Sequence, residues 1–164
     1  MNRMKNANTL SSDAQKVQAS LAARGIQANV LEISESTHTA AEAARAIGCQ
    51  LAQIAKSLVF RAEQSGAAIL VITSGANRVN EQRLAVLVGE PIAKASPDFV
   101  REATGFAVGG VPPVGHSTAL RIFIDQDLRQ HAAIWAAAGT PRSMVRLTPA
   151  ELEAATGGVV ADVK

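Results

Sequence analysis

The stretch from Gly109 to His116 has the residue types that bring bare backbone N–H groups to a ligand. It holds three glycines and two prolines between two apolar runs, 106–108 and 120–125. Glycine lets a ligand approach the backbone closely, and proline fixes φ and removes one donor. Such a stiff loop can form an oxyanion hole, in which N–H groups stabilise the negative charge that develops on an ester carbonyl. The same composition also suits a plain turn.

Two charged residues stand beside strand-forming stretches and could serve such a site. Lys56 precedes the stretch 57–60, so its ammonium is expected either to guard a strand edge or to point into a cleft toward a phosphate or a polarised carbonyl. Asp125 ends the stretch 121–125, where it either caps the following helical turn or binds an amino group and orients Lys56. The polar segment 74–80 is expected to form a turn and helix cap, with the rim of a site as the alternative.

The elements that must position these residues alternate irregularly along the chain. Ser, Thr and Asn at candidate N-caps and Gly at candidate ends predict helices, whereas apolar runs bounded by turn residues predict strands. The expected helices cover 12–24, 40–47, 81–87, 97–104 and 149–156, and the expected strands cover 28–33, 53–62, 67–73, 106–108, 120–124 and 144–147, with a short strand after residue 91. Segment 127–131 suits a helical turn, and 132–138 suits either a helix or a strand. The strands over 53–62 and 67–73 are separated by a short turn and are expected to form a hairpin. This hairpin and the irregular order of the elements predict an α/β fold of α+β type, with one mixed sheet in a single compact domain.

Composition narrows the classes of protein that the chain can belong to. The 164 residues are 48% apolar and include one Cys, so we expect a folded domain without an internal disulfide, in a reducing cytoplasmic compartment. No apolar run approaches the roughly 20 residues of a membrane span, and residues 1–9 are expected to be a frayed tail rather than a secretory signal. The net charge of only +2 argues against DNA binding and leaves local contacts with nucleic acid.

Motifs of metal and cofactor sites are missing from the sequence. It has no P-loop, GxGxxG, HExxH or CxxC pattern, and His38, His116 and His131 stand far apart. Cys49 has no adjacent basic partner and is expected to be a buried structural thiol. We therefore expect a site without metal or cofactor, in either a binding module or an enzyme that works by positioning and electrostatics.

Several short motifs occur together in a fixed order: TAAEAA (39–44), IAKSLV (54–59), SGAN (74–77), GF (105–106) before GGVPPVGH (109–116), and FID (123–125). Their order and spacing resemble the YbaK/EbsC family, which includes free-standing relatives of the editing domain of bacterial prolyl-tRNA synthetases. The resemblance extends from about residue 10 to 163. It implies one domain over 1–164, with a barrel-like mixed sheet surrounded by helices. It also implies metal-independent hydrolysis of the ester between a wrong amino acid and the 3′ end of a tRNA.

The resemblance assigns roles to the residues at matching positions. Lys56 looks like the family's critical lysine, which holds the terminal adenosine or the carbonyl, and Gly110 with its neighbours supplies the oxyanion donors. Asp125 looks like the acidic residue that orients the site. Substrate binding is expected from the residues around these three, namely Thr37, His38, Ser57, Gly109, Pro113, Gly115 and His116. The implied partners are the tRNA 3′ end and an aminoacyl-tRNA synthetase.

Three functions stay open at this point. The first is a trans-editing deacylase, the second a non-catalytic module that binds tRNA ends or a nucleotide in a regulatory role, and the third a small-molecule esterase or amidase, for which no activated nucleophile is visible. The chain has no Tyr, so a terminal adenine would stack on Phe60, Phe99, Phe106, Phe123, Trp135, an arginine or an apolar wall. Cys, Ala, Ser and Thr all remain possible as the edited amino acid, because one methyl or hydroxyl separates them by only about 1–3 kcal/mol.

Overall fold

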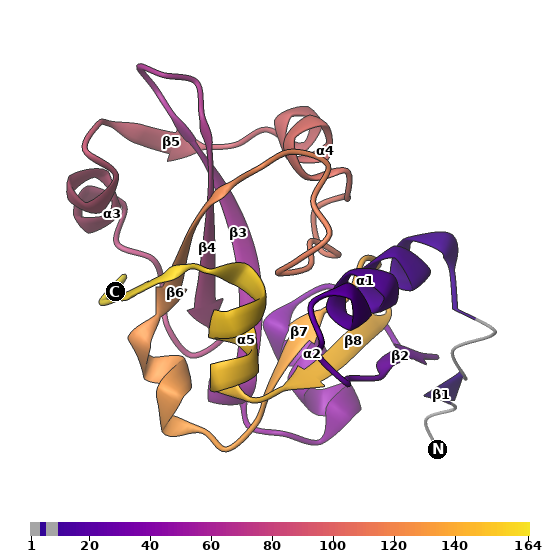
Figure 1. The fold of residues 1–164 in the computed structure, drawn as a ribbon. Helices are drawn as coiled ribbons and strands as arrows, with labels where there is room; N and C mark the ends of the chain where they lie inside the picture. The colour runs from indigo at the N-terminus through magenta and orange to yellow at the C-terminus, as the bar shows by residue number, and fades with distance from the viewer. Residues whose placement is uncertain (1–3, 6–9) are drawn as a thin grey trace.

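One mixed sheet runs through the computed structural model, which describes residues 4–5 and 10–164 (Figure 1). Its strands pair in the order β1-β2-β8-β7-β3-β4-β6-β9, and β5 pairs with β3. The β3–β7, β4–β6 and β6–β9 pairs are parallel, and the others are antiparallel. The strands are β1 Met4–Lys5, β2 Val30–Ile33, β3 Ile54–Ala62, β4 Ala68–Ser74, β5 Ile92–Lys94, β6 Arg121–Asp125, β7 Ile134–Ala137, β8 Ser143–Leu147 and β9 Val159–Ala161.

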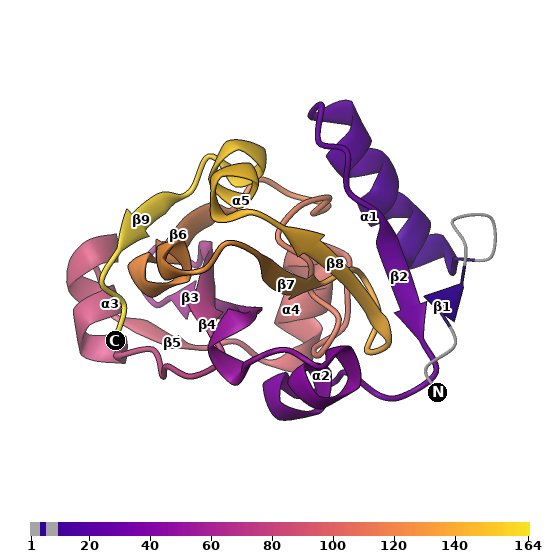
Figure 2. The ribbon, with the colours of Figure 1, turned by 90° about the horizontal axis from the view of Figure 1, so that it is seen from below.

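The helices begin where the sequence places their N-caps. They are α1 Ser12–Ala23, α2 Ala40–Ile47, α3 Glu81–Val88, α4 Pro97–Thr104 and α5 Pro149–Thr156, with 3₁₀ turns η2 Leu51–Gln53 and η3 Gln126–Gln130. In every α-helix the N-cap side chain accepts a hydrogen bond from the backbone N–H three residues further on. Figure 2 shows α1, α2, α3 and α5 around the outside of the curved sheet. The predicted α/β fold with a mixed sheet is confirmed.

Strand β4 is buried on both faces and divides the core. Leu70 and Ile72 belong to one apolar cluster, whereas Ile69 and Val71 belong to a second cluster. Side chains alternate between the two faces of a strand, so β4 supplies both clusters in turn. This explains why the stretch 67–73 is a nearly continuous apolar run rather than an alternating one.

The prediction of a strand over 106–108 is wrong. Phe106 is a core anchor, 1% exposed, and its N–H donates to Thr104 Oγ1 at 3.0 Å. The chain then turns at Gly109, where φ is +91°, and the Gly110 N–H donates to the Ala107 carbonyl at 3.0 Å. A tight turn therefore occupies the place of the expected strand, because the glycine allows a positive φ that a strand residue does not adopt.

The C-terminal half contains two strands that the sequence leaves open or does not predict. Segment 132–138 forms β7, in which Ala136 is fully buried between β3 and β8. β9 lies beside β6, and a Cβ at Gly158 would come within 2.9 Å of Ile122 Cγ2. The expectation of a tail over 1–9 lies outside the described residues, except that Met4–Lys5 form β1 and pair with β2.

Strand β3 has a gap in its pairing along one edge. Its first edge pairs with β4 over residues 55–61. On its second edge β7 pairs with Ile54 and Ala55, and β5 pairs with residues 60–62. Within the described ranges no strand pairs with residues 56–59 on this second edge. The gap leaves an opening in the sheet, and this opening positions the candidate site.

Candidate active site

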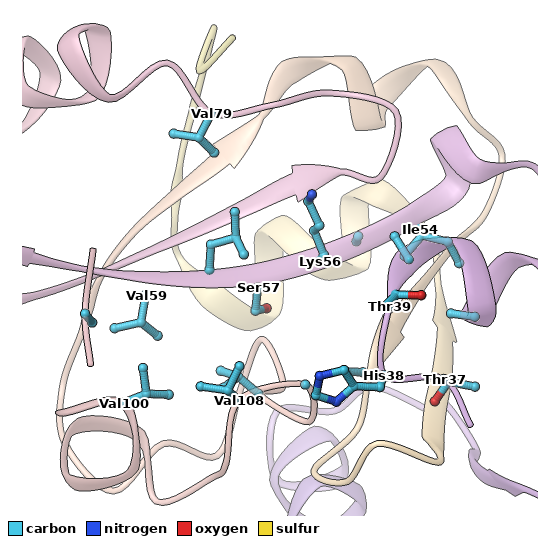
Figure 3. Close-up of a pocket in the computed structure, with 18 of the residues that line it drawn as sticks. Thr37, His38, Thr39, Ile54, Lys56, Ser57, Val59, Val79, Val100 and Val108 are labelled. Carbon is cyan, nitrogen blue, oxygen red and sulfur yellow. The ribbon is translucent and has the colours of Figure 1, made fainter. Parts of the chain in front are cut away.

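A cavity of about 660 Å³ lies at the opening beside β3 (Figure 3). Five segments far apart in the sequence supply most of its lining: residues 37–40 at the start of α2, residues 54–60 of β3, residues between 78 and 81 around the start of α3, residues 94–95 at the end of β5, and residues between 108 and 111 at the start of the Gly/Pro loop, which continues to residue 116. Ala43, Val100, Ala137 and Met144 complete the lining. The sequence-predicted residues that share this lining are Thr37, His38, Lys56, Ser57 and Gly109.

The cavity carries more positive than negative charge. Lys56 is half-buried, and in Figure 3 it lies on the face of β3 opposite to Ser57. Arg78 and Lys94 also line the cavity, against one carboxylate, that of Glu81. None of these four charged groups forms an ion pair within the described part of the chain. A partly enclosed ammonium with no carboxylate partner is suited to a phosphate or to a carbonyl that gains negative charge.

The His38 ring and the Gly109 turn pack directly against each other. A Cβ at Gly109 would lie nearer than 3.0 Å to His38 Nδ1, which is closer than real Cβ atoms come to a neighbour. Thr37 beside it is buried, and its hydroxyl donates to the Pro141 carbonyl at 2.7 Å. The start of α2 is therefore fixed against two loops, and the His38 ring is placed at the cavity wall by the lack of a side chain at residue 109.

The Ser57 hydroxyl is the one buried side-chain polar atom without a hydrogen-bond partner among the described residues. Leaving such a group unpaired costs about 1–3 kcal/mol, so it calls for an explanation. Ser57 lies on β3 within the gap in the pairing and lines the cavity. An unsatisfied hydroxyl at this place supports a binding role for this part of β3.

Gly110, expected to supply the oxyanion donor, lies outside the cavity lining. Its N–H is occupied by the Ala107 carbonyl, and its own carbonyl accepts from the Gly139 N–H at 2.9 Å. A Cβ at Gly110 would lie 2.8 Å from Thr140 Cα. Gly110 therefore allows two backbone segments to approach, while the neighbouring Gly109 faces the cavity.

The second half of the Gly/Pro loop turns toward α1 rather than toward the cavity. Pro113 is buried, and a Cβ at Gly115 would be in ordinary contact with Ser20 of α1 at 3.5 Å. His116 Nε2 bonds to the Pro112 carbonyl at 2.7 Å, and burial lowers the pKa of the His116 imidazole below its ordinary value. Pro113, Gly115 and His116 thus stabilise the loop that presents Gly109.

Asp125 also lies outside the cavity lining, where it anchors the turn after β4. Its Oδ2 accepts from Thr73 Oγ1 at 3.1 Å, the Ser74 N–H at 3.0 Å and Asn77 Nδ2 at 2.9 Å, while Oδ1 accepts from the Asp127 N–H at 2.9 Å. The residue is 1% exposed. Its carboxylate fixes the SGAN turn, which leads directly into the cavity wall at residue 78. The segment 74–80 is thus a turn, and it also borders the cavity.

Several lining residues carry no signal in the sequence. Val100 comes from α4, Val108 from the Gly/Pro loop and Lys94 from the end of β5. Val108 is 48% exposed, so part of its side chain is open at the cavity. The polar composition of segment 74–80 did indicate a rim around Arg78 and Val79. Val100, Val108 and Lys94 reach the cavity through long-range packing, which no local pattern in the sequence indicates.

Two classes of structural feature are lacking over residues 4–5 and 10–164. No three His, Cys, Asp or Glu side chains gather into a group that could hold a metal ion. None of the helices there is long and apolar enough to cross a membrane.

Burial raises the pKa of the Cys49 thiol, so the reactive thiolate is disfavoured at that position.

The mixed sheet that opens onto this cavity matches a solved structure from one class of protein, the domains that edit aminoacyl-tRNA. The family model described as the aminoacyl-tRNA editing domain matches residues 34–155, and the chain belongs to this family. The matched range contains every cavity segment named above.

Individual relatives agree with this assignment. A solved structure described as that of a candidate trans-editing enzyme for prolyl tRNA synthetase matches with a TM-score of 0.90 and 50% identity, over 95% of this chain and 99% of that one. The uncharacterised protein YwhH of Bacillus subtilis is 34% identical over 124 residues, 76% of this chain and 78% of YwhH. EbsC of Enterococcus faecalis, named provisionally as a Cys-tRNA(Pro)/Cys-tRNA(Cys) deacylase, is 24% identical over 131 residues, 79% of each chain. The resemblance seen in the sequence is confirmed.

Proposed function

We propose that this chain is a trans-acting deacylase that hydrolyses the ester bond of a mischarged aminoacyl-tRNA. The observation that carries the proposal is the Lys56 ammonium, which has no ion-pair partner among the described residues and lies in a cavity with surplus positive charge. The editing-domain family and the descriptions of two relatives, one as a trans-editing enzyme and one as a deacylase, support the same reaction.

The chemistry requires little more than positioning, since an aminoacyl ester is already activated. Lys56 holds a terminal phosphate or the ester carbonyl by a charge-assisted hydrogen bond. Water attacks the carbonyl carbon, the bond to the ribose oxygen breaks, and the ribose oxygen takes up a proton, which releases a free amino acid and intact tRNA. The proposed donor to the oxyanion is the Gly109 N–H, because Gly109 lines the cavity and the Gly110 N–H is already bonded to Ala107.

The other lining residues receive supporting roles. Thr37 and His38 enclose the aminoacyl end beside Gly109. Arg78 and Lys94 attract the phosphates of the single-stranded tRNA terminus. This attraction is local, as expected for a chain whose net charge is only +2. Asp125 acts as a positioning residue through the SGAN turn, since it touches the turn and not the cavity.

Deacylation assays test the proposal. We would measure hydrolysis of Cys-, Ala-, Ser- and Thr-charged tRNA(Pro) by the wild type, by Lys56→Ala and by Lys16→Ala, a control that removes the same charge from an exposed site on α1. Loss of one transition-state contact typically costs about 10²–10³ in rate, so Lys56→Ala should lose at least about a hundredfold in kcat/KM while Lys16→Ala keeps wild-type activity. Hydrolysis no faster than in buffer for every tRNA would exclude the deacylase.

Two further measurements, binding of uncharged tRNA and turnover of simple esters, separate the two remaining functions. Tight binding of uncharged tRNA without turnover would identify a non-catalytic module. Turnover of simple esters that added tRNA does not inhibit would identify a small-molecule esterase.

A further inference from the structure

The gap in the pairing of β3 exposes a short run of peptide groups inside the cavity. Residues 56–59 lack a strand partner on the edge between β7 and β5, within the described chain. The same residues belong to the cavity lining. Figure 3 shows Lys56 on one side of the strand and Ser57 and Val59 on the other. The peptide groups of a strand point along its edges, between these two rows of side chains.

Hydrogen bonds elsewhere on β3 show which peptide groups face the cavity. The Ile54 carbonyl accepts from the Gly75 N–H at 2.7 Å, and the Ala62 N–H donates to the Ala67 carbonyl at 2.9 Å, so both residues direct their peptide groups toward the β4 side. The register with β4 is continuous over residues 55–61. Peptide groups of successive strand residues point to opposite edges, so the odd-numbered residues, Ser57 and Val59, direct N–H and C=O into the gap.

The exposed edge offers a carbonyl acceptor followed by an N–H donor. The Watson–Crick edge of adenine carries the complementary pair, a donor at N6 and an acceptor at N1. The Ser57 carbonyl can accept from the exocyclic N6 amino group, and the Val59 N–H can donate to N1. Val59, Val100 and Val108 lie along the same side of the cavity and provide flat aliphatic walls for the ring (Figure 3). Val108 is 48% exposed, so its side chain is accessible to a ring in the cavity.

The cavity offers little Phe or Trp surface on which an adenine could stack. Of the five aromatic residues, Phe60 is the one that lines the cavity, and it is only 4% exposed. Phe106 and Phe123 are 1% and 2% exposed and belong to the core, and neither Phe99 nor Trp135 is part of the lining. An adenine held in this cavity therefore has no Phe or Trp ring to stack on, which leaves the aliphatic walls, the Arg78 guanidinium and the His38 ring for its faces and polar contacts for its edge.

We propose that the free edge of β3, through the peptide groups of Ser57 and Val59, binds the Watson–Crick edge of the terminal adenine of the tRNA. The assignment to tRNA rests on the proposed function, since a free adenine nucleotide would present the same edge. The unpaired Ser57 hydroxyl at the same point of the strand is the independent sign that this segment is built for a ligand.

Nucleotide analogues test the contact without mutation. The probe is adenosine 5′-monophosphate, titrated into isotopically labelled protein while the amide signals of Ser57 and Val59 are followed. The 7-deaza analogue, which keeps N1 and N6, should bind like the parent nucleotide. The 1-deaza analogue and the purine nucleotide without N6 should each bind about fivefold more weakly, the effect of one lost hydrogen bond. Equal affinities for the 1-deaza and 7-deaza analogues would overturn the proposal.

A backbone variant gives a second test. Val59→Pro removes an N–H that faces the gap, so no bond to β4 is lost. Compared with Val59→Ala, which keeps the N–H, it should bind the nucleotide at least about fivefold more weakly while retaining the wild-type circular dichroism. If Val59→Pro does not fold, the analogue series decides alone. Equal nucleotide affinity of the two folded variants would contradict the assignment.

Three comparisons separate the edge contact, its assignment to tRNA and the proposed function from one another. Nucleotide binding at β3 without any deacylation would remove the proposed function and leave the edge contact standing. Deacylation that is indifferent to replacing the terminal base of an acceptor minihelix by 1-deazaadenine would overturn the edge contact alone. Tighter binding of adenosine 5′-monophosphate than of an uncharged minihelix would assign the edge to a free nucleotide and overturn the assignment to tRNA.

Discussion

Replacing Gly109 by alanine tests the packing of the cavity wall at its tightest point. The φ of +91° at Gly109 disfavours any residue with a Cβ, and the added methyl would collide with the His38 ring. Both effects act on the same turn, but they have different origins. One belongs to the backbone, and the other depends on the neighbouring side chain.

The two contributions can be given magnitudes. An L-residue held in a left-handed conformation costs about 1–3 kcal/mol. Displacing the His38 ring from its position adds about 0.5–1.5 kcal/mol if the ring leaves its preferred rotamer. Gly109→Ala should therefore lower the free energy of unfolding by about 1.5–4.5 kcal/mol. It should also lower kcat/KM in deacylation, because the displaced ring would enter the substrate space.

Urea denaturation with two further variants separates these contributions. Gly89→Ala is the matched control, because Gly89 has a φ of +93° and no atom within 4 Å of an added Cβ. It should show the backbone cost alone. In a His38→Ala background the methyl at residue 109 has no ring to displace, so the added cost of Gly109→Ala should fall to that of Gly89→Ala.

Two results would refute this reasoning. A cost for Gly109→Ala equal to that of Gly89→Ala in the wild-type background would show that the ring yields without penalty. A cost that does not change when the ring is removed would show that His38 is not the neighbour that matters.

Three further variants probe the surroundings of the cavity. Ser57→Ala removes an unpaired buried hydroxyl and should raise the free energy of unfolding by about 1 kcal/mol while weakening substrate binding; a loss of stability in urea denaturation would show that the hydroxyl has a partner. Asp125→Asn presents an amide N–H to at least one of the four donors around the carboxylate, so it should cost about 1–3 kcal/mol of stability and reduce kcat/KM through the SGAN turn; unchanged melting would contradict the anchoring role. His116→Gln tests a pH effect. Because burial lowers the pKa of His116 in the folded state, the unfolded chain binds the proton more readily, and stability should fall as the pH drops below about 6.5 toward the lower folded pKa. Denaturation at pH 7.5 and 5.5 should show a smaller decrease for the variant than for the wild type, and equal decreases would exclude His116 as the cause.

The helices could be predicted from the sequence because their signals are local. Ser11, Thr39, Asn80, Ser96 and Thr148 each accept the hydrogen bond that defines an N-cap, and nothing distant is needed for that contact. The β3–β4 hairpin is local in the same sense. The strands in the C-terminal half were harder, since β7 is alanine-rich and β9 depends on a close approach to β6 that Gly158 permits.

The site was predictable only in part, for a related physical reason. The motifs indicated that Lys56, His38 and Gly109 belong together, and the structure brings them to one cavity. They did not indicate which glycine of the pair 109–110 faces that cavity, because the answer depends on the turn bond to Ala107 and on packing against Thr140. The sequence likewise marks Asp125 as a carboxylate at the end of a strand. It does not indicate that the partners of this carboxylate come from β4 and the turn after β4.

The gap beside β3 also bears on self-association through unpaired strand edges. An unpaired strand edge is a template on which a second chain can add a strand and begin to aggregate. Here β7 and β5 limit the unpaired run to residues 56–59, with partnered residues on both sides. A segment of four residues, about 13 Å long, is shorter than a typical strand, and loops and helices enclose it. The fold can thus keep backbone donors and acceptors of β3 open to a small ligand, while this unpaired run is too short for another chain to extend the sheet at that place.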